Sequence, residues 1–190
     1  MRLFFRPYLR YKFFNAVFSG VVGGSVFTIY ASLPPSTFSV GGIVLAFGMM
    51  GIATLYHRWM RIDYFYRFTL LTEIIMLAMV LYFLLFPTHA VTALIVYAAY
   101  QLSFVLGGYL ARAETRFARK ARIMGWLDVA KQQGYVGGLA LSYLFYKAIE
   151  RYGITENRAQ VYQLHWILLI VECSVIVTLV RSFQRREGTA

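Results

Sequence analysis

Six long stretches of apolar residues follow one another along the chain, separated by short polar segments. They cover residues 13–31, 37–56, 64–86, 90–110, 127–149 and 161–182. Each stretch is close to the roughly 20 residues that a helix needs to cross the hydrocarbon core of a bilayer. None of them alternates polar and apolar positions, so the pattern predicts helices and excludes a closed barrel of strands. We therefore predict one domain over residues 1–190, an all-α integral membrane protein with six transmembrane helices.

The basic residues fall mostly on one side of this topology. Of the 19 Lys and Arg residues, all but Lys147, Arg151 and Arg158 lie on the side that holds both termini: before the first span, between or at the adjoining ends of spans two and three and of spans four and five, or at the end of the sixth. Cytoplasmic segments collect cations, so we expect both termini in the cytoplasm, with a bacterial inner membrane as the setting. In a soluble protein a net charge of +11 would indicate nucleic acid. Here orientation and anionic headgroups explain the charge, and no nucleic-acid partner is expected.

Composition and motifs argue against other classes of protein. With 59% apolar residues among 190, little of the chain remains for a domain outside the membrane. The single cysteine, Cys173, can form no internal disulfide. His57, His89 and His165 stand near span ends without the spacing of metal ligands, so we expect no metal site. Nucleotide-binding, dinucleotide-binding and hydrolase motifs are absent from the sequence, and we expect neither an enzyme nor a cofactor.

Glycine divides the spans into two kinds. The glycines of spans one, two, four and five are Gly20, Gly23, Gly24, Gly41, Gly42, Gly48, Gly51, Gly107, Gly108, Gly134, Gly137 and Gly138. Small residues let helix backbones approach closely in lipid, so these four spans should make close helix contacts. Spans three and six contain no glycine and should be bulkier and more peripheral. Because the order glycine, glycine, none occurs twice, we predict a 3+3 inverted repeat, a plan that many transporters share.

Two acidic residues lie deep in the apolar spans. Glu73 is about nine residues into the third span, and Glu172 is near the middle of the sixth. Ionisable groups at such depth usually face a cavity or a partner. One interpretation is that these carboxyl groups bind and release a proton that drives transport. The other is a structural carboxyl group that bonds a neighbouring helix.

Polar side chains also mark spans one and four. Asn15 and Tyr30 lie in the first span, and Tyr97, Tyr100 and Gln101 lie three and four residues apart on one face of the fourth. A set of tyrosine and amide groups suits a cavity for an organic solute. Hydrogen bonds between helices would account for the same residues equally well.

The fifth span begins with an unusually polar segment. Asp128 and Lys131 are three residues apart and could pair on one helix face, and Gln132 and Gln133 follow directly. The segment suits a gate that opens and closes an inner passage. It also suits the salt-bridged start of a helix among the lipid headgroups.

Two motifs indicate a family: the segment 48–51 leading into residues 57–61, and Asp128 with the run 132–138. In these motifs the chain resembles one six-helix half of the major facilitator superfamily. The resemblance implies that helices one and four line a cavity, that helices two and five join two halves, and that helices three and six support them from outside. The family has an aspartate after the first glycines of the loop between helices two and three, where this chain reads Ile-Ala-Thr-Leu-Tyr.

The resemblance implies a half-size transporter that needs a second copy. We expect a homodimer that meets through spans two and five and moves a small solute by alternating access, coupled to protons. The alternative is a non-transporting subunit that anchors or assembles a larger complex through its basic segment 112–131. A channel is a third possibility, although the sequence has no ring-forming charged motif.

Overall fold

The computed structural model describes residues 1–87 and 91–184 of an almost entirely helical chain; His89, Arg185 and Arg186 lie outside these ranges. The helices are α1 Phe5–Gly23, α2 Val26–Tyr30, α3 Pro35–Thr54, α4 Tyr56–Trp59, α5 Ile62–Leu85, α6 Thr92–Ala118, α7 Ala121–Arg151 and α8 Asn157–Ser182. The predicted all-α fold is confirmed, and the long helices coincide with the predicted apolar stretches. Four of them, α3, α5, α6 and α8, are long and apolar enough to cross a membrane.

Helix boundaries follow glycine, proline and the local backbone. The first predicted span is two helices: α1 ends before Gly24, and the short α2 completes it. Pro35 stands in the first turn of α3, where a missing N–H costs nothing. The basic segment after span four is not one continuous helix, because Arg119 adopts a positive φ of 53° and α7 starts two residues later.

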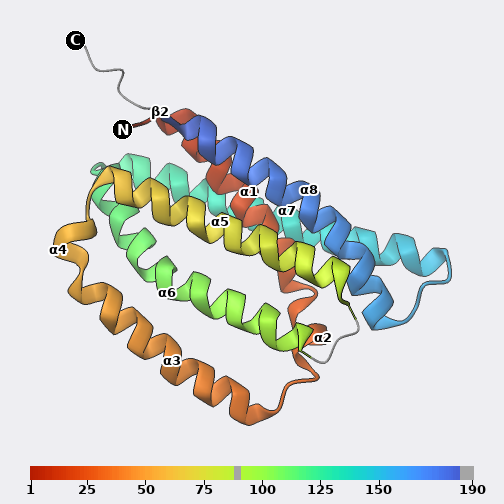
Figure 1. The fold of residues 1–190 in the computed structure, drawn as a ribbon. Coiled ribbons are helices and arrows are strands. Elements are labelled where there is room, and N and C mark those ends of the chain that lie inside the picture. The colour runs from red at the N-terminus through yellow and green to blue at the C-terminus, as the bar shows by residue number, and fades with distance from the viewer. Residues whose placement is uncertain (88–90, 185–190) are drawn as a thin grey trace.

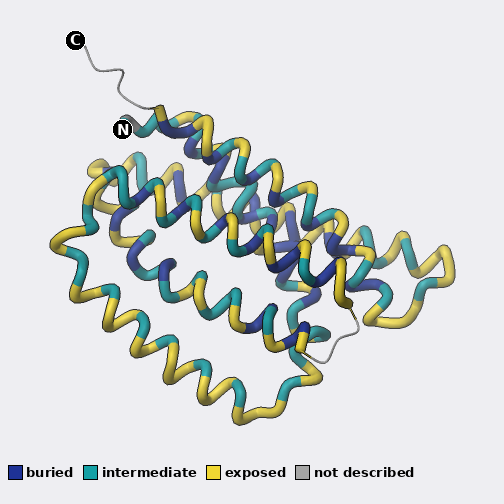
Figure 2. The backbone as a smooth tube through the Cα atoms, viewed as in Figure 1, coloured by how far each residue is buried: buried dark blue, intermediate teal, exposed yellow. Residues whose placement is uncertain are grey.

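The long helices pack in a series. Helix α7 packs on α1, α1 on α8, α8 on α5, α5 on α6, and α6 on α3 (Figure 1). The expectation that spans three and six are peripheral is therefore wrong within the chain, since α5 and α8 occupy the middle of the series. Their bulky side chains fill the core, with Val80, Leu168 and Val175 fully buried. Helix α3 lies at one end, and none of its residues is buried (Figure 2).

Glycine brings α1 and α7 into backbone contact, as predicted for two of the glycine-rich spans. A Cβ added to Gly134 would overlap the carbonyl oxygen of Phe13, and one added to Gly138 would overlap that of Val17. From the other helix, a Cβ on Gly20 would meet the backbone of α7. These glycines form what we call the α1–α7 seam. They are used inside the chain, so the predicted meeting of two copies cannot occur through Gly134 and Gly138.

The two ends of the described chain lie side by side. Strand β1, Arg2–Leu3, pairs antiparallel with β2, Phe183–Gln184, and the N–H of Phe4 donates to the carbonyl of Ser182 at 2.9 Å. This places both ends at the same end of the bundle (Figure 1).

Candidate functional site

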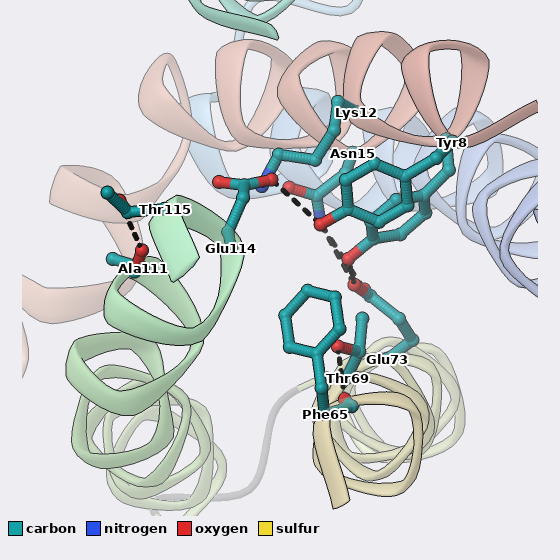
Figure 3. Close-up of polar contacts among 10 residues, drawn as sticks. Tyr8, Lys12, Asn15, Phe65, Thr69, Glu73, Ala111, Glu114 and Thr115 are labelled. Atoms are coloured by element: carbon teal, nitrogen blue, oxygen red, sulfur yellow. Dashed lines mark hydrogen bonds and ion pairs between the residues drawn. The ribbon is translucent and has the colours of Figure 1, made fainter. Parts of the chain in front are cut away.

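A buried carboxyl group lies at the centre of the bundle. Glu73, in the middle of α5, is 2% exposed. The hydroxyl group of Tyr11 donates to its Oε1 at 2.5 Å, and the Nδ2 of Asn15 lies 3.1 and 3.3 Å from its two oxygens (Figure 3). Both donors come from α1. These hydrogen bonds replace those that water would donate to the carboxylate. They therefore offset the cost of burying Glu73 in an apolar bundle, whether it is fully charged or shares a proton.

A second carboxyl group, Glu172 of α8, stands beside the first. It is fully buried, and the acidic group that acts on it electrostatically is Glu73. Within the described part of the chain, no N–H or O–H group donates a hydrogen bond to either oxygen of Glu172. Tyr100 of α6 is close enough to interact electrostatically with Glu172 and with Tyr30. Glu73 and Glu172, which we call the carboxyl pair, are thus brought together from the two glycine-free spans.

An ion pair links α1 to α6 nearer the chain ends. The Nζ of Lys12 lies 2.9 Å from Oε1 of Glu114, and the hydroxyl group of Tyr8 donates to the same oxygen at 2.7 Å (Figure 3). The two charged side chains are only 14% and 15% exposed. Tyr8 and Tyr11 have ring centroids 5.3 Å apart, so this ion pair and the carboxyl pair flank one pair of tyrosine rings.

Sequence reasoning did not identify Tyr8, Tyr11, Lys12 or Glu114 as site residues. The residues of α1 had a usable signal, because positions 8, 11, 12 and 15 are three and four apart and so share one helix face. The signal at Glu114 was weaker, because this residue stands between two arginines in a segment that is otherwise basic. An acidic residue among cations on the same helix is a reason to look for a partner on another helix.

The predicted cavity residues are divided between two places. Asn15 binds Glu73 of the carboxyl pair, whereas Tyr30 and Tyr97 pack with Phe38 in an aromatic cluster at the other end of the bundle. Tyr100 lies between the two places, near both Glu172 and Tyr30. The rings of Tyr30 and Tyr97 are 5.4 Å apart and nearly perpendicular. The hydroxyl group of Tyr97 occupies the space where Gly41 has no side chain, which explains a glycine at that position. This cluster joins α2, α3 and α6.

A groove between α3 and α6 adjoins the aromatic cluster. It has a volume of about 460 Å³, and its lining is mostly apolar, with Tyr97 and Gln101 among its polar members. In the part of the chain that the structure describes, the Oε1 of Gln101 is buried and has no hydrogen-bond donor. The groove is therefore suited to an apolar chain or a weakly polar solute.

The polar segment of α7 lies apart from both places. Asp128, Lys131, Gln132 and Gln133 are all exposed on this helix. No ion pair joins Asp128 and Lys131 in the structure of residues 1–87 and 91–184.

The two described histidines differ in their surroundings. His57 is exposed and its Nδ1 lies 2.9 Å from the carbonyl oxygen of Thr54. His165, which we expected at the membrane interface, is buried between helices and stacks on Phe83 with ring centroids 3.8 Å apart. Among the described residues, no three His, Cys, Asp or Glu side chains gather where they could hold a metal ion.

Comparison of the chain with protein-family models, with characterised proteins and with solved structures finds no match. Function is therefore argued from the site alone.

Proposed function

We propose that this chain is a half-size secondary transporter that works as a homodimer, moves a small solute by alternating access, and is driven by protons through the carboxyl pair. The pair is the observation that carries the proposal. We place the protein in a bacterial inner membrane, with six transmembrane helices and both termini in the cytoplasm. The resemblance to half of a major facilitator superfamily protein belongs to the same proposal.

The chemistry of the pair favours proton binding. Two adjacent carboxyl groups hydrogen-bond to each other only when at least one is protonated, because a carboxylate oxygen can only accept. Two like charges side by side in an apolar interior are costly, and one proton shared between them removes most of that cost. Tyr11 and Asn15 donate to Glu73 and so favour it as the charged member. We therefore assign the bound proton to Glu172, because no N–H or O–H group of the described structure donates a hydrogen bond to its oxygens.

Helix packing supports the 3+3 inverted repeat. Suppose that α1 is exchanged with α6, α3 with α7, and α5 with α8. The contact of α1 with α7 then becomes the contact of α6 with α3. In the same way, the contact of α1 with α8 becomes that of α6 with α5, and the contact of α5 with α8 maps onto itself. All of the main helix contacts are thus related in pairs by one exchange, as a pseudo-two-fold axis between the halves requires.

Exposed polar side chains on α7 support the proposal that a second copy completes the transporter. The third and fourth turns of this helix carry exposed Asp128, Lys131, Gln132 and Gln133. Side chains of this kind are expensive when they face lipid, and they usually face a bundle interior or water. A second copy placed against α7 and α3, the two ends of the helix series, would enclose these groups and complete a passage between the two chains.

Purified protein in vesicles with an imposed pH gradient tests the proposal. A pH dye inside the vesicles measures proton entry on addition of small organic solutes from a panel. We expect solute-dependent proton entry for the natural chain and for Glu156→Gln, an exposed control at the start of α8. Glu73→Gln and Glu172→Gln should abolish it while leaving expression and oligomeric state unchanged. Unaltered proton entry in both variants would refute coupling by the carboxyl pair.

A further inference from the structure

A basic pocket lies where α4 meets the end of α6. It has a volume of about 660 Å³ and is lined by Tyr56, His57, Met60, Arg112, Thr115 and Arg116. Arg112 and Arg116 are four residues apart, so both project from one face of α6. The lining contains no acidic residue, and neither arginine forms an ion pair with any part of the chain that the structure describes. The pocket therefore holds two uncompensated cations.

The floor of the pocket is rigid. The guanidinium group of Arg112 lies 5.9 Å from the ring centroid of Tyr56, and that ring packs against Tyr109 at 6.0 Å. Tyr109 is fully buried, and its hydroxyl group donates to the carbonyl oxygen of Trp59 at 2.6 Å. This hydrogen bond ties α4 to α6, so the aromatic rings hold the two sides of the pocket in fixed positions.

The pocket lies at the depth of lipid headgroups. Helices α3 and α6 are both long and apolar enough to cross a membrane. A helix that rises 1.5 Å per residue crosses a core of about 30 Å in about 20 residues. Counted from its start at Thr92, α6 leaves the core at about Ala111, immediately before Arg112. Helix α3 has 20 residues and ends at Thr54, so Tyr56 and His57 also lie just beyond the core.

An apolar surface continues from the pocket into the core. One leaflet contributes about 15 Å of the core, which corresponds to about 10 residues of helix. Measured back along α6 from Arg112, this distance reaches Leu102, which lines the apolar groove between α3 and α6. A headgroup in the pocket would thus have its acyl chains beside a surface of matching length.

We propose that this pocket binds the phosphate group of one anionic phospholipid from the cytoplasmic leaflet. Arginine is suited to a phosphate because its planar guanidinium group can donate two parallel hydrogen bonds to phosphate oxygens. The Nδ1–H of His57 donates to the carbonyl oxygen of Thr54, so its Nε2 can donate to a phosphate oxygen only when the ring is in the imidazolium form. The ligand class is a diacyl phospholipid with net negative charge, seated between α4 and α6. The site is independent of what the protein transports.

Native mass spectrometry of the full chain, released from phosphatidylcholine nanodiscs that contain graded amounts of phosphatidylglycerol, tests the site. We expect one phosphatidylglycerol molecule to stay bound to each chain of the natural protein. The double variant Arg112→Gln/Arg116→Gln should lower the affinity about 100-fold or more, since each Arg loses a charge-assisted hydrogen bond to phosphate that contributes about tenfold or more. Both side chains are exposed, so the variant should fold, and elution of a single species in size exclusion verifies this.

The matched control is Arg119→Gln/Lys120→Gln. It removes the same charge from exposed positions near the end of α6 that do not line the pocket. We expect its affinity to stay within about twofold of the natural protein, because neither side chain lines the pocket that would hold the phosphate. An equal loss in both double variants would overturn the site, since it would show diffuse attraction. Displacement of the lipid by millimolar inorganic phosphate would also overturn it, because the acyl chains would then contribute nothing.

Discussion

Gly138→Ala is expected to separate α1 from α7. The added Cβ would overlap the carbonyl oxygen of Val17 and lie 2.9 Å from the Cα of Gly20, and both neighbours are backbone atoms. Backbone atoms in a helix cannot turn aside as a flexible side chain can, so the two helix axes must move apart by about 1 Å to restore van der Waals distances. A gap of that size forfeits about a quarter to a half of the dispersion energy between facing atoms.

The expected cost is large because lipid supplies no hydrophobic force that would press the helices together. Overpacking of a tight interface typically costs about 1–3 kcal/mol, and a contact between two backbones should lie at the upper end, at about 3 kcal/mol. Gly137→Ala is the matched control, since a Cβ there meets no atom within 4 Å. It should stabilise α7 by up to about 1 kcal/mol through helix propensity alone.

The measurement is thermal unfolding in mild detergent, followed by circular dichroism and by tryptophan fluorescence. At about 2–4 °C per kcal/mol, the two variants should differ in Tm by about 10 °C, with Gly138→Ala the lower. Equal midpoints for both variants, at or above that of the natural chain, would refute backbone contact at the α1–α7 seam.

Three further substitutions test other contacts. Gly41→Ala should destabilise the aromatic cluster, because its Cβ would overlap the Tyr97 ring, and in combination with Tyr97→Ala the loss of Tm should be smaller than the sum of the two single losses. Lys12→Gln and Glu114→Gln should each cost between about 1 and 3 kcal/mol, with the double variant costing less than their sum, as a double-mutant cycle of unfolding free energies would measure. Tyr109→Phe should lower stability by about 1–3 kcal/mol, since it leaves a carbonyl oxygen of α4 without its donor; an unchanged midpoint of chemical unfolding would contradict that role.

The apolar pattern predicted the long helices, because about 20 apolar residues in a row have few alternatives in a membrane. This pattern could not predict which helices pack against one another. Glycine content predicted close contacts for the spans that form α1 and α7 but not that these two helices meet, and it wrongly placed α5 and α8 outside. Glycine content indicates only how closely helix backbones can approach. Burial in this bundle depends instead on the size of the side chains, as Val80 and Leu168 show.

The candidate site was predictable in part. Glu73 and Glu172 stood out because carboxyl groups are rare at such depth, but nothing in one sequence says that two helices bring them side by side. Tyr11 escaped notice because tyrosine is common in this chain, which has 15 of them. Its role depends on a contact between α1 and α5, which are far apart in sequence, and that contact exists only in the folded bundle.

The pairing of β1 with β2 bears on how two copies can be joined. Since Leu3 lies opposite Phe183, the first and last described segments of each chain lie together. Two copies standing parallel across a two-fold axis could therefore be encoded as one polypeptide, with a short tether that never has to traverse the bilayer. Such a tandem would allow one copy to carry a substitution while the other stays intact, so the contribution of each carboxyl pair could be counted separately.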